Sequence, residues 1–106
     1  MHNTIVIMAE NVLKAIEQLD EKKLFFDKTF NIASDIVSSL KKKLPELIIE
    51  KSKNSWSEVS MAMGKEVLLL VVYLGLLPKL FPGDEIISRA SYRLLEEIKE
   101  LESKKE

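Results

Sequence analysis

Apolar residues recur with heptad spacing through the first 44 residues, a stretch that contains neither glycine nor proline. Eleven of the twelve seam positions are apolar. A period of 3.5 residues is typical of a helix that buries one continuous face. Because the phase does not change across residues 20–23, the pattern favours one long helix from about Thr4 to Lys43. The alternative is a break at Asp20–Lys23, with Asp20 capping a second helix. The seam consists of Ile5, Ala9, Val12, Ile16, Leu19, Lys23, Phe26, Phe30, Ala33, Val37, Leu40 and Leu44.

Proline and a capping motif divide the next part of the chain. Pro45 disfavours a helical conformation in the residue before it and can itself open a helix. We therefore expect the long helix to be interrupted there and a short helix to follow at Pro45–Lys51. Ser55 and Glu58 have the spacing of a capping box, which predicts a further helix from about Trp56 to Leu77.

Two prolines and a glycine at residues 78–83 predict a loop, and Asp84 is placed to cap a last helix from about Glu85 to Ser103. On that helix the pairs Glu85–Arg89 and Arg93–Glu97 have the spacing of ion pairs on the solvent side. No stretch alternates with a period of two residues, so we expect no sheet. The predicted fold is all-α, a single domain over residues 1–106 built as a bundle of four or five helices, with the long N-terminal helix as its spine.

Residues 67–77 are apolar or nearly so without interruption. Crossing a bilayer takes about 20 such residues, and runs of 10–14 are more often buried helices of a soluble core. A helix that is apolar on every side must be covered on every side, which places it at the centre of the bundle or in an oligomer interface. Gly64 and Gly75 fall on one side of this helix. They indicate close helix packing there, or a contact between the backbone and a ligand.

The composition excludes several kinds of chemistry. With 106 residues, 46% hydrophobic and 31% charged, the chain has the balance of a soluble globular domain. It has no cysteine, which excludes disulfides, cysteine-bound zinc, iron–sulfur clusters and thiol catalysis, and its single histidine is His2. We therefore expect no catalytic residues, metal or cofactor, and an enzyme with helix-borne carboxylates is the least favoured alternative. The first residues do not resemble a signal peptide, so a cytoplasmic location is expected. Enrichment in lysine and glutamate fits a thermophile, or an AT-rich genome equally well.

Positive charge gathers between residues 41 and 79, where seven lysines and four glutamates give a net charge of +3, although the whole chain carries −1. Lysines near the ends of helices also stabilise the helix dipole, so this charge can have a purely structural role. Its functional interpretation is a patch that contacts phosphates without reading sequence. The candidate nucleic-acid-binding residues are Lys41, Lys42, Lys43, Lys51 and Lys53.

A long N-terminal helix would leave part of its apolar face without a partner in the same chain, and uncovered faces of that kind mark interaction sites. We therefore expect the protein to work as an oligomer or as a subunit of a complex. The candidate interface residues are Phe25, Phe26, Phe30 and Trp56.

Two stretches resemble a known family. The first is residues 42–48, with the sequence KKLPELI, followed by Asn54-Ser55-Trp56, and the second is residues 88–99, with the sequence SRASYRLLEEIK. Both resemble the small all-helical subunit of Cmr-type (type III-B) CRISPR effector complexes. In that family a long first helix runs to a Lys-Leu-Pro-x-Leu-Ile segment and an Asn-Gly-Leu turn, and the last helix carries Thr-Arg, Leu-Leu-Glu, an aromatic residue, an aliphatic residue and lysine. This chain departs from the pattern at Ser55, which replaces the turn glycine, and at Glu97, which replaces the aromatic residue.

The resemblance implies a non-catalytic subunit that stacks along the backbone of an RNA-guided complex and helps to hold the guide–target duplex through basic residues. The five candidate lysines match that role only in their general basic character. Base pairing would then read the sequence, while the protein recognises backbone and shape. The alternative is a homo-oligomeric helical interaction module that pairs through the heptad seam and has no role with nucleic acid. Both interpretations require further protein chains as partners, and neither requires a membrane.

Overall fold

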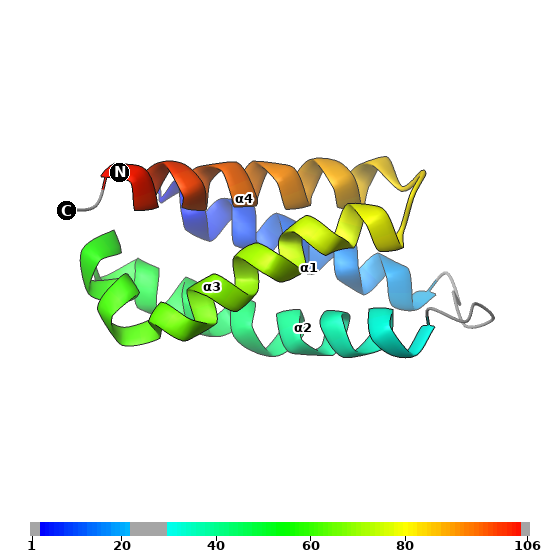
Figure 1. Ribbon diagram of the computed structural model, residues 1–106, viewed down its shortest axis with the longest axis horizontal. Helices are drawn as coiled ribbons and strands as arrows, with labels where there is room; N and C mark the ends of the chain where they lie inside the picture. The colour runs from blue at the N-terminus through cyan, green and yellow to red at the C-terminus, as the bar shows by residue number, and fades with distance from the viewer. Residues whose placement is uncertain (1–2, 22–29, 105–106) are drawn as a thin grey trace.

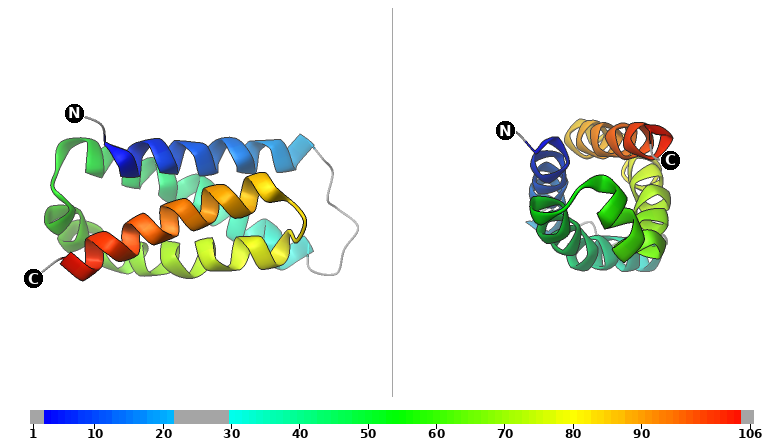
Figure 2. Two further views of the ribbon diagram at one scale, coloured as in Figure 1. Left: turned by 90° about the horizontal axis from the view of Figure 1, so that it is seen from above. Right: turned by 90° about the vertical axis from the view of Figure 1, so that its left-hand side faces the viewer.

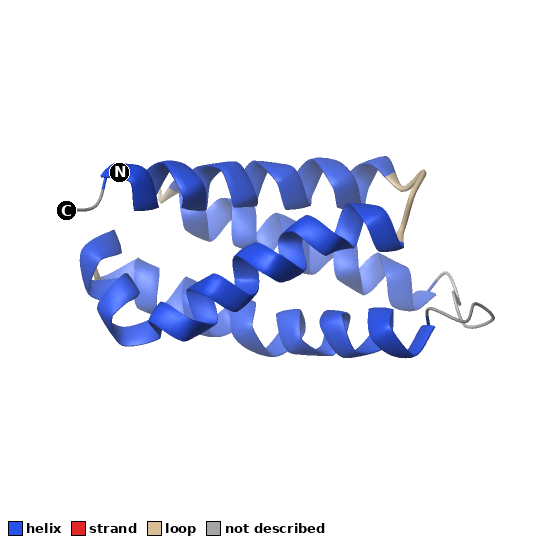
Figure 3. Cartoon of the chain, in the orientation of Figure 1, coloured by secondary structure: helices blue, strands red, loops and turns tan. Residues whose placement is uncertain are grey.

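The computed structural model describes residues 3–21 and 30–104, which form four helices and contain no strand (Figure 3). They lie alongside one another in an elongated bundle with extents of 44 × 25 × 21 Å (Figure 1). The predicted all-α helical bundle is confirmed, with four helices. These are α1 (Thr4–Glu21), α2 (Phe30–Lys53), α3 (Trp56–Leu80) and α4 (Glu85–Lys104).

Each helix packs against two neighbours, in the order α1, α2, α3, α4 around the bundle axis (Figure 2). Helix α1 is therefore diagonal to α3, and α2 is diagonal to α4. All four helices contribute to one core, and Val12, Leu40, Leu70 and Leu94 are completely buried in it. Because every helix has two packed sides, the outward side of each one is the only surface that it can offer to a partner.

The predicted long N-terminal helix is wrong. Helix α1 ends at Glu21, and α2 packs against α1 instead of extending it. The alternative of two separate helices is confirmed, but Asp20 lies inside α1 and does not cap α2. Lys23 and Phe26 lie outside the described residues. The seam positions with described side chains are nevertheless all buried: Ile5, Ala9, Val12, Ile16, Leu19, Ala33, Val37, Leu40 and Leu44.

Helix α2 continues through Pro45 to Lys53, so the predicted interruption and the short helix Pro45–Lys51 are wrong. A proline inside a helix costs about 3 kcal/mol, because it cannot donate a backbone hydrogen bond and its ring crowds the preceding turn. Leu44 and Leu47 on either side of the proline are both fully buried. Burial of each leucine contributes about 1.5–3 kcal/mol. Keeping both in the core therefore offsets the cost of the proline, and the helix remains continuous.

Helix α3 begins with the predicted capping box. The Ser55 hydroxyl accepts a hydrogen bond from the Glu58 backbone N–H over 3.3 Å, and the Ser55 N–H donates to Glu58 Oε1 over 3.1 Å. The helix bends at Met63, whose φ of −128° and ψ of 31° are not helical. It passes through Pro78 and ends at Leu80, three residues beyond the predicted end.

The turn between α3 and α4 follows the predicted chemistry. Gly83 has a φ of 91°, in the left-handed region that favours glycine. Asp84 Oδ1 then accepts a hydrogen bond from the Ile87 N–H over 3.1 Å and caps α4 as predicted. The short connection makes α3 and α4 antiparallel neighbours (Figure 2).

Candidate functional site

The outward side of α3 exposes large apolar side chains. Met61, Leu68 and Val72 are 88%, 67% and 54% exposed, and Leu69 is also exposed. Residues three or four apart on a helix are surface neighbours, so Leu68, Leu69 and Val72 form one continuous apolar stretch. We refer to Gly64, Leu68, Leu69, Val72 and Gly75 together as the α3 face.

The inner side of the same helix is equally apolar and is buried, with Val67, Leu70, Leu74 and Leu77 in the core. Helix α3 is one of four peripheral helices, so of the two predicted positions, the centre of the bundle or an oligomer interface, the first does not occur (Figure 2). Its second apolar side has no cover from the described part of this chain. The outward side therefore has the composition of a core helix and the exposure of a surface.

The two glycines of the α3 face have no close neighbours. A Cβ atom added at Gly64 or at Gly75 would meet nothing within 4 Å, so the predicted close packing at these glycines does not occur within the described chain. Both glycines lie on the same side of the helix as Leu68. The absence of side chains there lets an external backbone or side chain come close to α3.

Helix α3 is also long and apolar enough to cross a membrane, judged by length and composition alone. Within its most apolar window, 33% of the residues are buried in the bundle. The core helix of a soluble protein passes the same test of length and composition. The buried Leu70, Leu74 and Leu77 of α3 also cover the apolar sides of α2 and α4. Removing α3 from the bundle would expose those sides.

The predicted nucleic-acid-binding lysines all lie on α2, but not on one side of it. Lys42 and Lys53 are exposed and the other three are half-buried. Consecutive residues of a helix point about 100° apart, so the run at 41–43 cannot form a single face. Glu46 and Glu50 lie between the lysines and reduce the local charge from +5 to +3. The five lysines are Lys41, Lys42, Lys43, Lys51 and Lys53.

Of the predicted interface residues, Trp56 is the one whose side chain the structure describes. It is 7% exposed and belongs to the core, not to the surface. Phe25 and Phe26 lie outside the described residues, as does the side chain of Phe30 at the start of α2. The expectation of an uncovered seam depended on the long helix, and the described seam positions are in fact buried within one chain.

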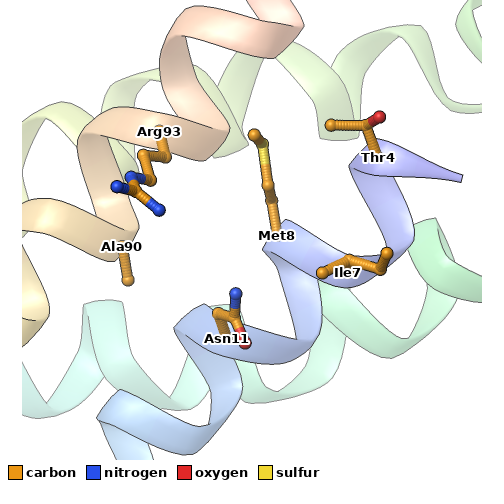
Figure 4. A pocket seen from close by; sticks show the side chains of 6 residues that line it. All are labelled: Thr4, Ile7, Met8, Asn11, Ala90 and Arg93. Atoms are coloured by element: carbon orange, nitrogen blue, oxygen red, sulfur yellow. The ribbon is translucent and has the colours of Figure 1, made fainter. Parts of the chain in front are cut away.

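A groove that the sequence pattern did not predict runs between α1 and α4, on a side of the bundle that does not include α3. One hollow of about 150 Å³ lies between Met8 and Asn11 of α1 and Ala90 and Arg93 of α4 (Figure 4). A second hollow of about 290 Å³ extends it towards Lys14 and Arg89, and a third of about 390 Å³ extends it towards Glu96 and Glu100. We refer to this feature as the α1–α4 groove.

The charged side chains of α4 are not paired as the sequence predicted. Neither Glu85–Arg89 nor Arg93–Glu97 forms an ion pair among the described residues. An ion pair on this helix joins Lys104 to Glu100 over 3.0 Å. The helical positions of these residues could have been read from the sequence, but their packing against α1 depends on the fold.

Metal ligands and acid–base groups are the other candidates for a site among the described residues. No group of three or more histidine, aspartate or glutamate side chains among them could hold a metal ion. The pKa of Glu58 is lowered, first by the hydrogen bond from the Ser55 backbone and then by the one from the Ser55 hydroxyl. That shift belongs to the helix cap. Comparison of the chain with protein families, with curated proteins and with solved structures found no match in any of the three.

Proposed function

We propose that this protein is a non-catalytic interaction module whose working surface is the α3 face, docked against another protein chain. The observation that carries the proposal is the exposure of Leu68 and Val72 on a helix whose opposite side fills the core. Contiguous apolar surface is rare on soluble monomers and marks interaction sites when it occurs.

A protein partner fits the α3 face better than a lipid bilayer does. The face is one side of a helix whose other side is held by α2 and α4, so only a narrow apolar strip is available. Helices pack by inserting the side chains of one into the spaces of the other. Gly64 and Gly75 provide such spaces, because nothing lies within 4 Å of their Cβ positions. Contact with a bilayer does not depend on such spaces in the helix surface.

The direct test is site-specific photocrosslinking in the cells that make the protein. A photoreactive amino acid at Val72 should give a discrete crosslink to one protein, which mass spectrometry identifies. The matched position is Glu46, which is exposed on the outward side of α2. The same amino acid there should give no such product.

The crosslinked partner is then tested with purified components. The double substitution Leu68→Glu and Val72→Glu should weaken its binding by about a hundredfold or more, because two buried apolar contacts become unpaired charges. Circular dichroism should be unchanged, since both side chains are exposed. No product from Val72 above the level at Glu46, or recovery of the protein on floating vesicles in place of a protein partner, would refute the proposal.

A second candidate places the protein in an RNA-guided complex, as its small helical subunit. Its support is the resemblance of residues 42–48 and 88–99, together with the net charge of +3 that residues 41–53 give to the end of α2. Helix α2 is a neighbour of α3, so one subunit could contact a protein through the α3 face and phosphates through α2. Lysine contacts of this kind tolerate any sequence and weaken with salt.

The test of this candidate is titration with labelled single-stranded RNA and DNA at low and moderate salt. Changing Lys41, Lys42 and Lys43 together to glutamate should abolish binding, with helix content unchanged. The control makes the same change of charge at the exposed lysines Lys14, Lys65 and Lys99, and should retain binding. Equal loss in both variants, or no binding by the original protein, would refute the candidate.

A further inference from the structure

The two arginines of the sequence lie together on the α1–α4 groove. Arg89 and Arg93 are four residues apart on α4, both are exposed, and both line the groove. Neither makes an ion pair or hydrogen bond among the described residues. Lys14 of α1 lies at the same end. Among the side chains that the structure describes, this half of the groove therefore presents positive charge that has no partner.

The other half of the groove is acidic. Glu96 and Glu100 are exposed and line it beyond Arg93. The series Arg89, Arg93, Glu96, Glu100 has spacings of four, three and four residues, which keep all four side chains on one side of the helix. Glu100 also pairs with Lys104. That pair is exposed, and exposed pairs of this kind hold their partners weakly.

The order of these charges allows the helix to pair with an antiparallel copy of itself. Each arginine then lies opposite a glutamate of the other copy, and each glutamate lies opposite an arginine. When a second α4 lies antiparallel to the first, with the two-fold axis between residues 94 and 95, Arg89 comes level with Glu100 of the second copy. Arg93 comes level with Glu96 of the second copy. Both matches occur in one register, because Arg89 and Glu100 lie equally far from the axis along the helix, and so do Arg93 and Glu96. The symmetry repeats each match, which gives four ion pairs between the copies.

We propose that a second copy of this chain docks on the α1–α4 groove, with the two α4 helices antiparallel about this two-fold axis. Ile7 and Ile86 are 46% and 56% exposed at the edges of the groove and provide the apolar contact that charge pairs alone would not supply. The hollows between α1 and α4 accept side chains from the second copy. A uniformly acidic partner would satisfy the arginines but would meet Glu96 and Glu100 with like charge.

This surface is independent of the proposed function. Helix α1 is diagonal to α3, and the groove lies on the α1 side of α4. The proposed dimer therefore leaves the α3 face open to its own partner. A result that refutes the proposal for one surface does not affect the proposal for the other, because each is tested with its own variants.

The experiment is sedimentation equilibrium of the full chain over a range of concentrations, in low salt. The original protein should be in monomer–dimer equilibrium. Variant A carries Arg89→Glu and Arg93→Glu, and variant B carries Glu96→Arg and Glu100→Arg. Each variant alone should dimerise about tenfold more weakly or worse, because every charge pair becomes a repulsion. A mixture of A and B should recover dimerisation, since all four pairs are then complementary in the mixed dimer.

Recovery of the dimer on mixing A and B would show that the charge pairs hold the two copies together. A variant that lost dimerisation through damage to its own fold would not be rescued by the other. The matched control, Lys42→Glu and Lys53→Glu on α2, changes the net charge as much as variant A and should dimerise like the original protein. The proposal is overturned if the original protein is monomeric at every concentration, or if A and B do not recover each other although each keeps its helical circular dichroism. It is also overturned if Leu68→Glu with Val72→Glu abolishes the dimer, because the copies then meet through α3.

Discussion

Asn3 and Lys51 are joined across 48 positions of the sequence by a hydrogen bond in which Asn3 Nδ2 donates to the backbone carbonyl of Lys51 over 2.8 Å. The last four carbonyls of a helix have no partner within it, and Lys51 lies in the last turn of α2. The side chain that precedes α1 thus satisfies the end of α2. The backbone carbonyl of Asn3 meanwhile accepts from the Ile7 N–H in the first turn of α1. One residue therefore fixes the two helix ends relative to each other.

We expect Asn3→Ala to lower the free energy of unfolding by about 1 kcal/mol, the usual value of such a hydrogen bond. Urea denaturation followed by circular dichroism measures it. The control is Asn11→Ala, because Asn11 is exposed in the middle of α1 and its side chain makes no hydrogen bond among the described residues. A loss at Asn11 as large as that at Asn3 would show that the bond to Lys51 does not stabilise the fold.

Leu68 and Leu70 are two positions apart on α3 and differ strongly in burial: Leu70 is completely buried and Leu68 is 67% exposed. Leu70→Ala should lower the free energy of unfolding by about 2–5 kcal/mol, from lost apolar burial and the cavity left behind. Leu68→Ala should change it by about 0.5 kcal/mol or less. Measurement by urea denaturation at a concentration that keeps the protein monomeric compares the two. Similar losses at both positions would mean that α3 is covered on both sides within one chain.

The periodicity of apolar residues predicted which side of α1 and of α2 is buried, and it failed to predict where the first helix ends. Val12 and Leu40 were assigned to one seam, and both are in the core. Each helix of an antiparallel pair needs its own apolar stripe, so the same positions suit one long helix or two packed ones. Continuity of phase between Leu19 and Ala33 does not distinguish them. That choice depends on tertiary packing, which also keeps α2 intact at Pro45.

Of the two candidate surfaces, the sequence indicated the α3 face and gave no sign of the α1–α4 groove. The unbroken apolar run at 67–77 predicted that α3 needs cover on every side, and the structure shows that its outward side lacks cover within the described chain. The α1–α4 groove was missed because it depends on which helices are neighbours. The charges of Arg93 and Glu97 were interpreted as a pair within α4, the local choice available without the fold. Arg93 lies across the hollow from Met8 and Asn11 only because α1 packs beside α4 (Figure 4).

The cap of α3 should make stability depend on pH. The hydrogen bonds from Ser55 lower the pKa of Glu58 in the folded protein, so the charged form is favoured by folding. The stability that the charged Glu58 carboxylate contributes is therefore complete above the pKa of about 4.3 that glutamate has in the unfolded chain. It is lost as the pH falls through the lower pKa of the folded protein. Glu58→Gln should be less stable than the original protein at neutral pH. The difference should shrink as the pH is lowered below about 4.

Urea titrations at a series of pH values measure this difference directly. Glu96→Gln is the control, because Glu96 is exposed on α4 and makes no hydrogen bond or ion pair among the described residues. Its difference from the original protein should stay nearly constant with pH. A difference at Glu58 that is independent of pH would contradict a stabilising role for its charge.

Gly83 and Gly75 should respond in opposite ways to the same substitution. A Cβ atom would meet nothing within 4 Å at either position, so steric contact does not distinguish them. Gly83 has a φ of 91°, which an L side chain adopts at a cost, and Gly83→Ala should lower the free energy of unfolding by about 1 kcal/mol. Gly75 lies inside α3, where alanine is favoured over glycine, and Gly75→Ala should raise the free energy of unfolding by about 0.5–1 kcal/mol. Urea denaturation of the two variants, at a concentration that keeps the protein monomeric, gives the sign of the change in the free energy of unfolding for each. A loss of stability at Gly75 would show that this side of α3 is in close contact within the chain, and the α3 face would then not be an open surface.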